Sequence, residues 1–259
     1  MRGVAIVFFV AVLYLIVADG LAPWIALPQL DSVGFTLVFV VFALAHCWAA
    51  YGARRTLVFF LAAAIISYAL EEAGVHTGAI YGPYHYGDML GWKIDRVPVL
   101  IPLAWFMMIY PSWIVARAIL RGAAVDSPVG IVLQALVAAL IMSAWDSVMD
   151  PGMAAAGNWV WEAGGPYFGV PLRNYAGWVL TTFLVYCVAG VLWRGGGRRA
   201  PQVDAGFAAL PVIIYAAYAL AYVTPKHLPA LQIVALFAMG TPALIALARI
   251  GLPTASRTI

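Results

Sequence analysis

Charged residues are scarce in this 259-residue chain: they make up 10% of the sequence, whereas hydrophobic residues make up 65%. In a soluble domain, roughly a quarter of the residues carry a charge. The chain therefore has too little polar surface to cover a water-soluble globule. The net charge of +3 follows from the placement of arginines described below, so it gives no reason to expect a nucleic-acid partner.

Motifs for several kinds of chemistry are also missing. The sequence has no Gly-x-Ser-x-Gly elbow, no dinucleotide fingerprint and no phosphate-binding loop, so hydrolase and nucleotide-dependent redox readings lose their usual support. It has no His-x-x-x-His or Cys-x-x-Cys pair to build a metal centre, and we expect neither a metal nor a cofactor. Cys47 and Cys187 lie in apolar runs, where a thiol usually packs as a small hydrophobic group.

Long apolar runs make up most of the chain. Each approaches the roughly 20 residues that cross a bilayer as a helix. They lie near 4–18, 33–53, 56–74, 98–120, 128–148, 175–193, 206–223 and 229–248. We therefore expect an all-α, polytopic membrane helix bundle of about eight transmembrane helices, forming a single integral membrane domain over residues 1–259.

The basic residues predict the orientation, because cytoplasmic flanks of membrane helices carry an excess of Lys and Arg. With the N-terminus inside, the cytoplasmic side holds Arg2, Arg54, Arg55, Arg117, Arg121, Arg194, Arg198, Arg199, Arg249 and Arg257. The outside then holds Lys93, Arg96, Arg173 and Lys226. We expect a multi-pass protein of the cell (inner or plasma) membrane with both termini in the cytoplasm.

The two long outer connections, residues 75–97 and 149–174, share one spacing pattern with the ends of the apolar runs before them. Each has an acid, a glycine eleven residues later, and two aromatic residues at alternate positions after the glycine. The first copy reads Glu71, Gly82, Tyr84 and Tyr86, and the second reads Asp146, Gly157, Trp159 and Trp161. Further on, Pro98 precedes Trp105 by seven residues, as Pro171 precedes Trp178. The pattern predicts a parallel internal repeat, helices three and four matching helices five and six, with a pocket between the copies.

Aromatic residues at the headgroup level are common in membrane proteins, and that reading accounts for most of these. It accounts poorly for acids in register, because an acid within a membrane helix is costly unless it is paired or functional. Glu71 and Asp146 are therefore candidate catalytic residues. Asp150 joins them because it lies four residues after Asp146, on the same helical face. Glu72 points about 100° away from Glu71, so at most one of the two faces a given pocket.

The Asp146–Asp150 pair also has the residue types of a magnesium–diphosphate site. A prenyltransferase would need a second acidic cluster and basic residues for the diphosphate, and the other copy offers Glu71 and Glu72 alone. His85 is a candidate for lining the site. Arg173 and Asn174 follow Val-Pro at the mouth of helix six, where either could hydrogen-bond Asp146 or Asp150 and fix its charge state.

In combination, these motifs resemble the CruF-type carotenoid biosynthesis family over residues 68 to 180. The motifs that carry the resemblance are Glu71-x-x-Gly74-Val75-x-Thr77-Gly78, Tyr84-x-Tyr86, Val97-Pro98-x-x-Ile101-Pro102-Leu103-Ala104-Trp105, Asp146-x-x-x-Asp150-Pro151, Gly157-x-Trp159-x-Trp161, Gly169-Val170-Pro171-Leu172-x-Asn174 and Gly177-Trp178. The family contains membrane carotenoid hydratases. The resemblance implies a lipid-soluble carotenoid substrate, contact with membrane lipid, and other carotenoid-pathway enzymes as possible partners. It also implies a lyase reaction, in which water adds across the terminal double bond of an acyclic end group to give a tertiary alcohol.

The residues fit such a reaction independently. Hydration of an alkene needs a proton donor, surroundings that tolerate a carbocation, and a water molecule. Glu71 and Asp146 are candidates for acid and base, and the sequence does not say which is which. The substrate-binding candidates are Tyr84, His85, Tyr86, Trp105, Trp159, Trp161, Arg173, Asn174 and Trp178. The alternatives are a small membrane transporter or proton-coupled carrier, in which the same acids would bind and release protons, and an enzyme that acts on another terpenoid.

Overall fold

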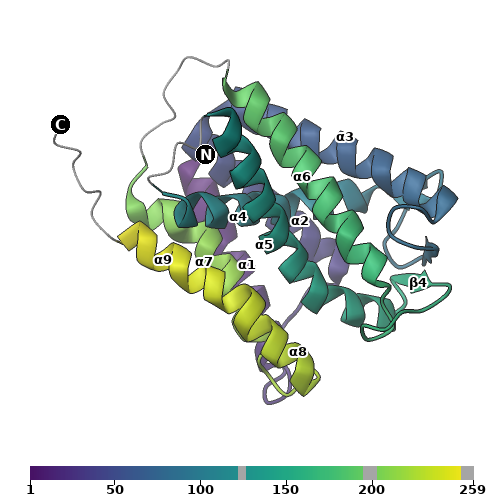
Figure 1. The fold of residues 1–259 in the computed structure, drawn as a ribbon. Coiled ribbons are helices and arrows are strands. Elements are labelled where there is room, and N and C mark those ends of the chain that lie inside the picture. Colours follow the sequence, from purple (N-terminus) through teal and green to yellow (C-terminus); the bar gives the residue numbers. More distant parts are fainter. Residues whose placement is uncertain (122–126, 195–202, 252–259) are drawn as a thin grey trace.

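The protein is a bundle of apolar helices (Figure 1). This computed structural model describes residues 1–121, 127–194 and 203–251. The elements in chain order are α1 (Arg2–Leu21), α2 (Ser32–Tyr51), α3 (Ala53–Thr77), β1 (Tyr84–Tyr86), β2 (Lys93–Ile94), β3 (Val97–Pro98), α4 (Leu100–Ile119), α5 (Pro128–Ala155), β4 (Trp159–Trp161), α6 (Leu172–Arg194), α7 (Ala205–Ala221), α8 (Pro229–Val234), a π-helical turn (Ala235–Gly240) and α9 (Thr241–Gly251). Arg198, Arg199 and Arg257, used above for orientation, lie outside the described residues.

The helices confirm the expected class, a polytopic membrane helix bundle. Within the described residues, seven helices are long and apolar enough to cross a membrane, if α8, the π-helical turn and α9 are taken as one. The remaining predicted span, 206–223, corresponds to α7, which is apolar but has only 17 residues. Helices are what such sequences must form, because lipid offers no hydrogen-bond partners and a helix satisfies its backbone internally. Three of the starts are set by side chains that cap the first turn: Asp31, Ser127 and Asp204.

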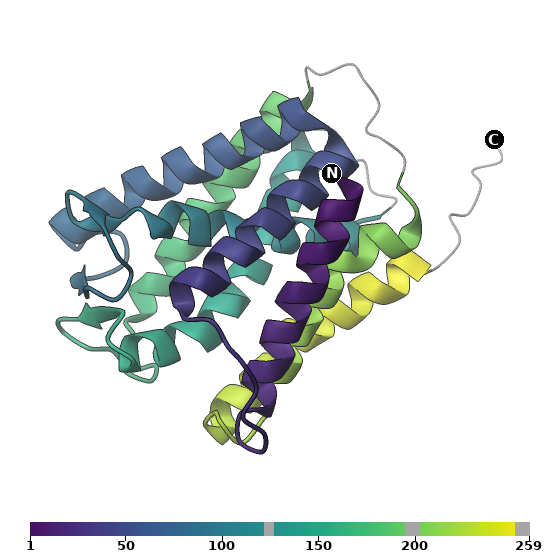
Figure 2. The same cartoon turned by 180° about the vertical axis from the view of Figure 1, so that it is seen from behind.

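Helix α4 lies at the centre of the bundle and contacts α2, α3, α5, α7 and α9. Its residues from Trp105 to Ala116 are all buried. Helices α3 and α6 lie side by side, as do α5 and α6 (Figure 1). Viewed from behind, α1 and α2 cover the opposite face (Figure 2). The N-terminal end of α1 and the β1–β4 ribbon lie at opposite ends of the molecule in both views.

The two outer connections meet in a short antiparallel ribbon. Strand β1 pairs with β4, so that Tyr84 lies opposite Trp161 and Tyr86 lies opposite Trp159. These are the two aromatic pairs of the shared spacing pattern, although the repeat itself stays a prediction. Gly82 and Gly157 precede the strands at φ values of 103° and 80°, which favour glycine. The strands could not be predicted from the sequence, because three residues are too few for an alternation pattern to show.

Tyr81 joins α3 to α6 beneath this ribbon. Its ring fills the space beside two glycines: a Cβ atom added to Gly74 or Gly177 would lie 2.7 Å or 2.4 Å from a ring carbon of Tyr81. Its hydroxyl lies 2.7 Å from the Thr181 hydroxyl. The glycines of the two motifs therefore let α3 and α6 close around a buried tyrosine, which positions the ribbon over the helix ends.

Candidate functional site

A cavity of about 470 Å³ lies at the end of the bundle that carries the ribbon. Its walls come from α1 to α7, from both strands of the β1–β4 ribbon, and from the connections after α1 and α7. All three acids proposed as catalytic from the sequence line it: Glu71 on α3, and Asp146 and Asp150 on α5. Their exposed fractions are 4%, 0% and 1%. The cavity is therefore a candidate active site with three buried carboxyl groups; Asp19 and Asp31 also line it but are not buried.

Glu71 lies in a cradle of hydrogen-bond donors. Its Oε2 accepts hydrogen bonds from the hydroxyls of Tyr84 and Tyr86, the latter at 2.8 Å, and its Oε1 accepts one from the indole Nε1 of Trp105 at 2.9 Å. Burial, and then the nearby Glu71 charge, raise the pKa of both tyrosines well above the ordinary value. The hydroxyls therefore stay protonated and remain donors to the carboxyl group.

Asp146 and Asp150 share one amide. The Nδ2 of Asn174 donates to Asp146 Oδ2 at 2.9 Å and to Asp150 Oδ2 at 2.7 Å. The indole Nε1 of Trp159 donates to Asp150 Oδ1 at 2.6 Å. Asp146 Oδ1 is buried and has no hydrogen-bond partner within the described part of the chain. Buried polar atoms are seldom left unpaired in proteins, so this oxygen is open to a hydrogen bond with a bound molecule.

Aromatic rings line the cavity together with Glu71 and the two aspartates. Trp105 and Trp178 are stacked, with ring centroids 4.0 Å apart, and Trp145 lies against Trp178 at 6.0 Å. Tyr84 lies 4.9 Å from Trp161 across the ribbon. Trp105 thus both donates to Glu71 and presents its ring to the cavity. Such faces stabilise a positive charge that forms between them.

Most of the residues singled out from the sequence line the cavity. They are Glu71, Tyr84, Tyr86, Trp105, Asp146, Asp150, Trp159, Trp161, Asn174 and Trp178. Trp145 and Tyr81 also line it, although the spacing patterns did not single them out. For Trp145 the available signal was its place directly before Asp146. Tyr81 had a weaker signal, its place directly before the Gly82 of the spacing pattern.

The structure places His85 and Arg173 outside the cavity lining, so a role in binding substrate stays a prediction for both. His85 stands between Tyr84 and Tyr86 on a strand, where side chains alternate, so it points to the other face. It is exposed, with Nδ1 3.5 Å from Glu162. Arg173 is exposed on α6 while its neighbour Asn174 is buried, because adjacent helical residues point about 100° apart.

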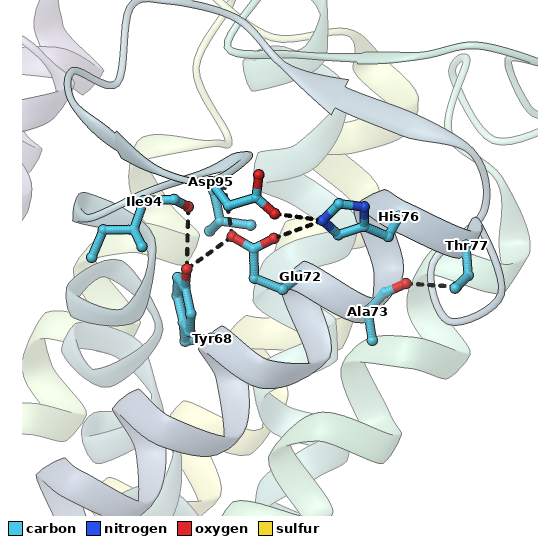
Figure 3. A network of polar contacts seen from close by, with 8 residues as sticks. Tyr68, Glu72, Ala73, His76, Thr77, Ile94 and Asp95 are labelled. Atoms are coloured by element: carbon cyan, nitrogen blue, oxygen red, sulfur yellow. Dashed lines mark hydrogen bonds and ion pairs between the residues drawn. The ribbon is translucent and has the colours of Figure 1, made fainter.

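Glu72 belongs to a separate network at the end of α3 (Figure 3). Its Oε1 accepts from the Tyr68 hydroxyl at 2.9 Å and from the Val97 N–H at 3.2 Å. Nε2 of His76 lies 3.4 Å from Glu72 and 2.6 Å from Asp95. The one nitrogen and two oxygens lie within 4.8 Å of one another, close enough for a small cation. However, His76 and Asp95 are exposed and paired, so we interpret the network as the attachment of the β2–β3 hairpin to α3.

Fold and site together define a polytopic membrane protein with an acidic, aromatic cavity at one end. Residues 32–249 match the family of carotenoid biosynthesis proteins, and the chain belongs to that family. It is similar to the bisanhydrobacterioruberin hydratase of Haloarcula japonica, with 33% identity over 129 residues. That stretch covers 49% of this chain and 42% of the relative, so less than half of the relative's length is matched. No solved structure matches the chain.

Proposed function

We propose that the protein is a carotenoid hydratase, which adds water across the terminal double bond of an acyclic carotenoid end group and yields a tertiary alcohol. The observation that carries the proposal is the cavity, in which buried carboxyl groups face aromatic and apolar walls inside a membrane helix bundle. The family and the hydratase relative support the same class of reaction. They also favour an enzyme over a proton-coupled carrier.

The reaction needs three things from the cavity. A carboxylic acid gives its proton to the less substituted carbon of the double bond, which leaves a tertiary carbocation on the other carbon. Water then forms the new C–O bond and releases a proton to a second carboxyl group. The rings of Trp105, Trp178 and Tyr84 are placed to stabilise the cation, each by up to about 2 kcal/mol when water is excluded.

The polyene would lie between the helices, reached from the lipid in which it dissolves. Apolar side chains make up much of the cavity lining, among them Leu15 and Ile16 of α1, Phe35 of α2, and Met149 and Met153 of α5. These residues fit a hydrocarbon chain, and the basic Lys226 in the lining is paired with Asp19. The acyclic end group would therefore reach the acids while the rest of the substrate stays in apolar surroundings.

An isotope experiment tests the reaction. Purified protein in detergent, given an acyclic carotenoid, should form the tertiary alcohol without oxygen, without a reductant and with chelator present. In heavy-oxygen water the new hydroxyl should carry the label, and in deuterated water the neighbouring carbon should gain one deuterium. An oxygen atom derived from molecular oxygen, or activity abolished by the chelator, would contradict the proposal.

Asp88→Asn is a matched control for changes at the acids. Asp88 is a fully exposed carboxylate in the loop after β1, paired with Lys93 at 3.1 Å. It does not line the cavity described here. The variant should hydrate the substrate at the wild-type rate, while Glu71→Gln and Asp146→Asn should abolish hydration in protein that still accumulates in the membrane.

We also propose that both termini face the cytoplasm and that the cavity opens toward the outside of the cell membrane. The support is the ten-to-four distribution of basic residues between the two sides. Cysteines introduced at Lys93 and Arg173 should react with an impermeant reagent added outside, and cysteines at Arg54 and Arg198 should not. Labelling of both pairs from the same side would contradict this orientation.

A further inference from the structure

We infer that the two acid groups of the cavity have different roles: Asp146 is the proton donor, Glu71 is the carboxylate that receives a proton from water, and Asn174 is the positioning residue for Asp146. This inference rests on the proposed hydration and assigns the parts of that reaction to named atoms. It follows from the hydrogen-bond donors around each carboxyl group.

Glu71 is surrounded by donors. Two hydroxyls and one indole N–H point at its two oxygens, and each of these groups is placed as a donor to the carboxyl. A carboxylate offers about four lone-pair positions, and hydrogen bonds to the charged form favour that form. The three donors occupy three of these positions and favour the charged form of Glu71. Glu71 is therefore held as a carboxylate, with one lone pair on Oε1 left to accept a proton.

The aspartates differ from Glu71 because they share a single donor group. Oxygens of both carboxyls lie within 2.9 Å of the Asn174 nitrogen, which places the two groups next to each other. Neighbouring carboxylates repel each other in an apolar site, so such a pair keeps one proton. Asp150 has a donor at each oxygen, from Trp159 and Asn174, whereas Asp146 has none at Oδ1 within the described chain. The retained proton belongs on Asp146 Oδ1.

The full cycle then balances. Asp146 transfers its proton to the less substituted alkene carbon, and the electron pair of the double bond forms the new C–H bond. The oxygen of a water molecule attacks the tertiary cation, and the proton lost from that water goes to Oε1 of Glu71. Exchange with solvent removes the proton from Glu71 and returns one to Asp146. The net change is one water added to one double bond, with nothing oxidised or reduced.

A partial reaction separates the two roles. In deuterated water, protonation of the alkene followed by loss of a proton returns labelled alkene without making alcohol. Glu71→Gln should lose alcohol formation by at least about 100-fold and still exchange deuterium into recovered alkene, within about tenfold of the wild type. Asp146→Asn should lose both by at least about 100-fold. Each variant is first checked for accumulation and for a single peak on size exclusion in detergent.

The outcomes distinguish an error in the roles of Asp146 and Glu71 from an error in the proposed hydration. If wild-type protein forms no labelled alcohol, the proposed hydration fails and the inference fails with it. If wild-type protein hydrates but Asp146→Asn exchanges deuterium and Glu71→Gln does not, the roles are reversed and only the inference is overturned. Hydration by Asp146→Asn at close to the wild-type rate would also overturn it.

Asn174→Leu gives a second measurement that does not change either acid. Leucine is close to asparagine in size but cannot donate to the aspartates, so proton transfer from Asp146 should slow. We expect a lower kcat together with a larger solvent deuterium isotope effect on kcat, because proton transfer then limits the rate. A general loss of folded protein would lower activity without changing the isotope effect. An unchanged isotope effect would contradict the positioning role of Asn174.

Discussion

The two ends of the helix bundle bury polar side chains in different ways. At the end away from the ribbon, His46 is 1% exposed. Its Nδ1 lies 2.6 Å from the Tyr110 hydroxyl and its Nε2 lies 2.7 Å from the Phe207 carbonyl oxygen. At the cavity end, Asp146 is equally buried but has one oxygen without a partner among the described residues. A buried polar group whose partners are complete fixes the packing, whereas one with an open position is available for chemistry.

The contrast extends to the neighbours of each group. His46 is stacked on the Phe207 ring, with centroids 4.3 Å apart, and lies near Phe42 and Tyr110 in the continuous core. The acids of the cavity lie at the edge of that core, where side chains border an open volume. The end with His46 should therefore determine stability, and the cavity end should determine activity. The following predictions test this division, beginning with the largest effect.

Asp146→Asn should lower the hydration rate by about 10²- to 10⁴-fold, the usual contribution of a general acid. Its thermal unfolding midpoint should be equal to or above that of the wild type, because Asp146 has to take up a proton to be buried beside Asp150 and an amide does not. Activity is measured by product formation and stability by heating detergent-solubilised protein before size exclusion. A large fall in the midpoint would show that Asp146 is a structural residue.

His46→Leu should have the opposite effects: it should lower stability and leave the hydration rate nearly unchanged. It leaves the Tyr110 hydroxyl and the Phe207 carbonyl buried without their partner, which costs about 1–3 kcal/mol in the free energy of unfolding. The hydration rate per folded molecule should stay within about twofold of the wild type, since His46 does not line the cavity. The same heating assay, combined with activity normalised to folded protein, checks both parts. A hydration rate that falls as far as in Asp146→Asn would contradict the division between the ends.

A smaller effect is expected when one donor of the Glu71 cradle is removed. Tyr86→Phe deletes the hydrogen bond to Oε2 at 2.8 Å and leaves the ring in place. A hydrogen bond to a charged group contributes about 1.5–3 kcal/mol, and part of it is lost equally from ground and transition states, so we expect a fall in kcat of about tenfold.

Tyr68→Phe is the matched control, because its hydroxyl donates to Glu72 at 2.9 Å in the network outside the cavity. Each variant removes a tyrosine hydroxyl that donates to a glutamate of α3, and Tyr68→Phe should leave kcat unchanged. Equal losses in Tyr86→Phe and Tyr68→Phe would show that the tyrosines act on the fold of the outer connections and not on Glu71.

Sequence patterns were sufficient for the helices and for the acids, because both leave signals at fixed spacing. A long apolar run can only cross lipid as a helix, and acids in register stand out against such runs. The contacts of each acid could not be predicted. Asp146 is in register with Glu71, but Trp159 donates to Asp150, one helical turn further on. That choice depends on how β1 and β4 pair, and the pairing joins residues far apart in the chain.

The spacing of residues in the sequence also did not predict which side chains face the cavity. Arg173 and Asn174 were both candidates for reaching the aspartates; Asn174 donates to both, while Arg173 beside it is exposed. Either residue could have been the one that faces inward, because the start of α6 sets the rotation of the whole helix. For the same reason Glu72 was known to point away from Glu71, but its attachment of the β2–β3 hairpin was not predicted.

The smallest effect is expected at two residues that the sequence alone had assigned to the site. His85→Ala and Arg173→Ala should each change kcat and KM by less than about twofold, because both side chains are exposed and neither lines the cavity. Each of the two residues lies directly beside a residue that we place in the site: Tyr86 follows His85, and Asn174 follows Arg173. Adjacent side chains on α6 point in different directions, so that Asn174 faces the cavity and Arg173 faces outward. Asn174→Leu should therefore impair turnover, and Arg173→Ala should not. Loss of activity in Arg173→Ala would instead show that its guanidinium reaches the aspartates during turnover, and the charge state that we assign to the pair would then have to include it.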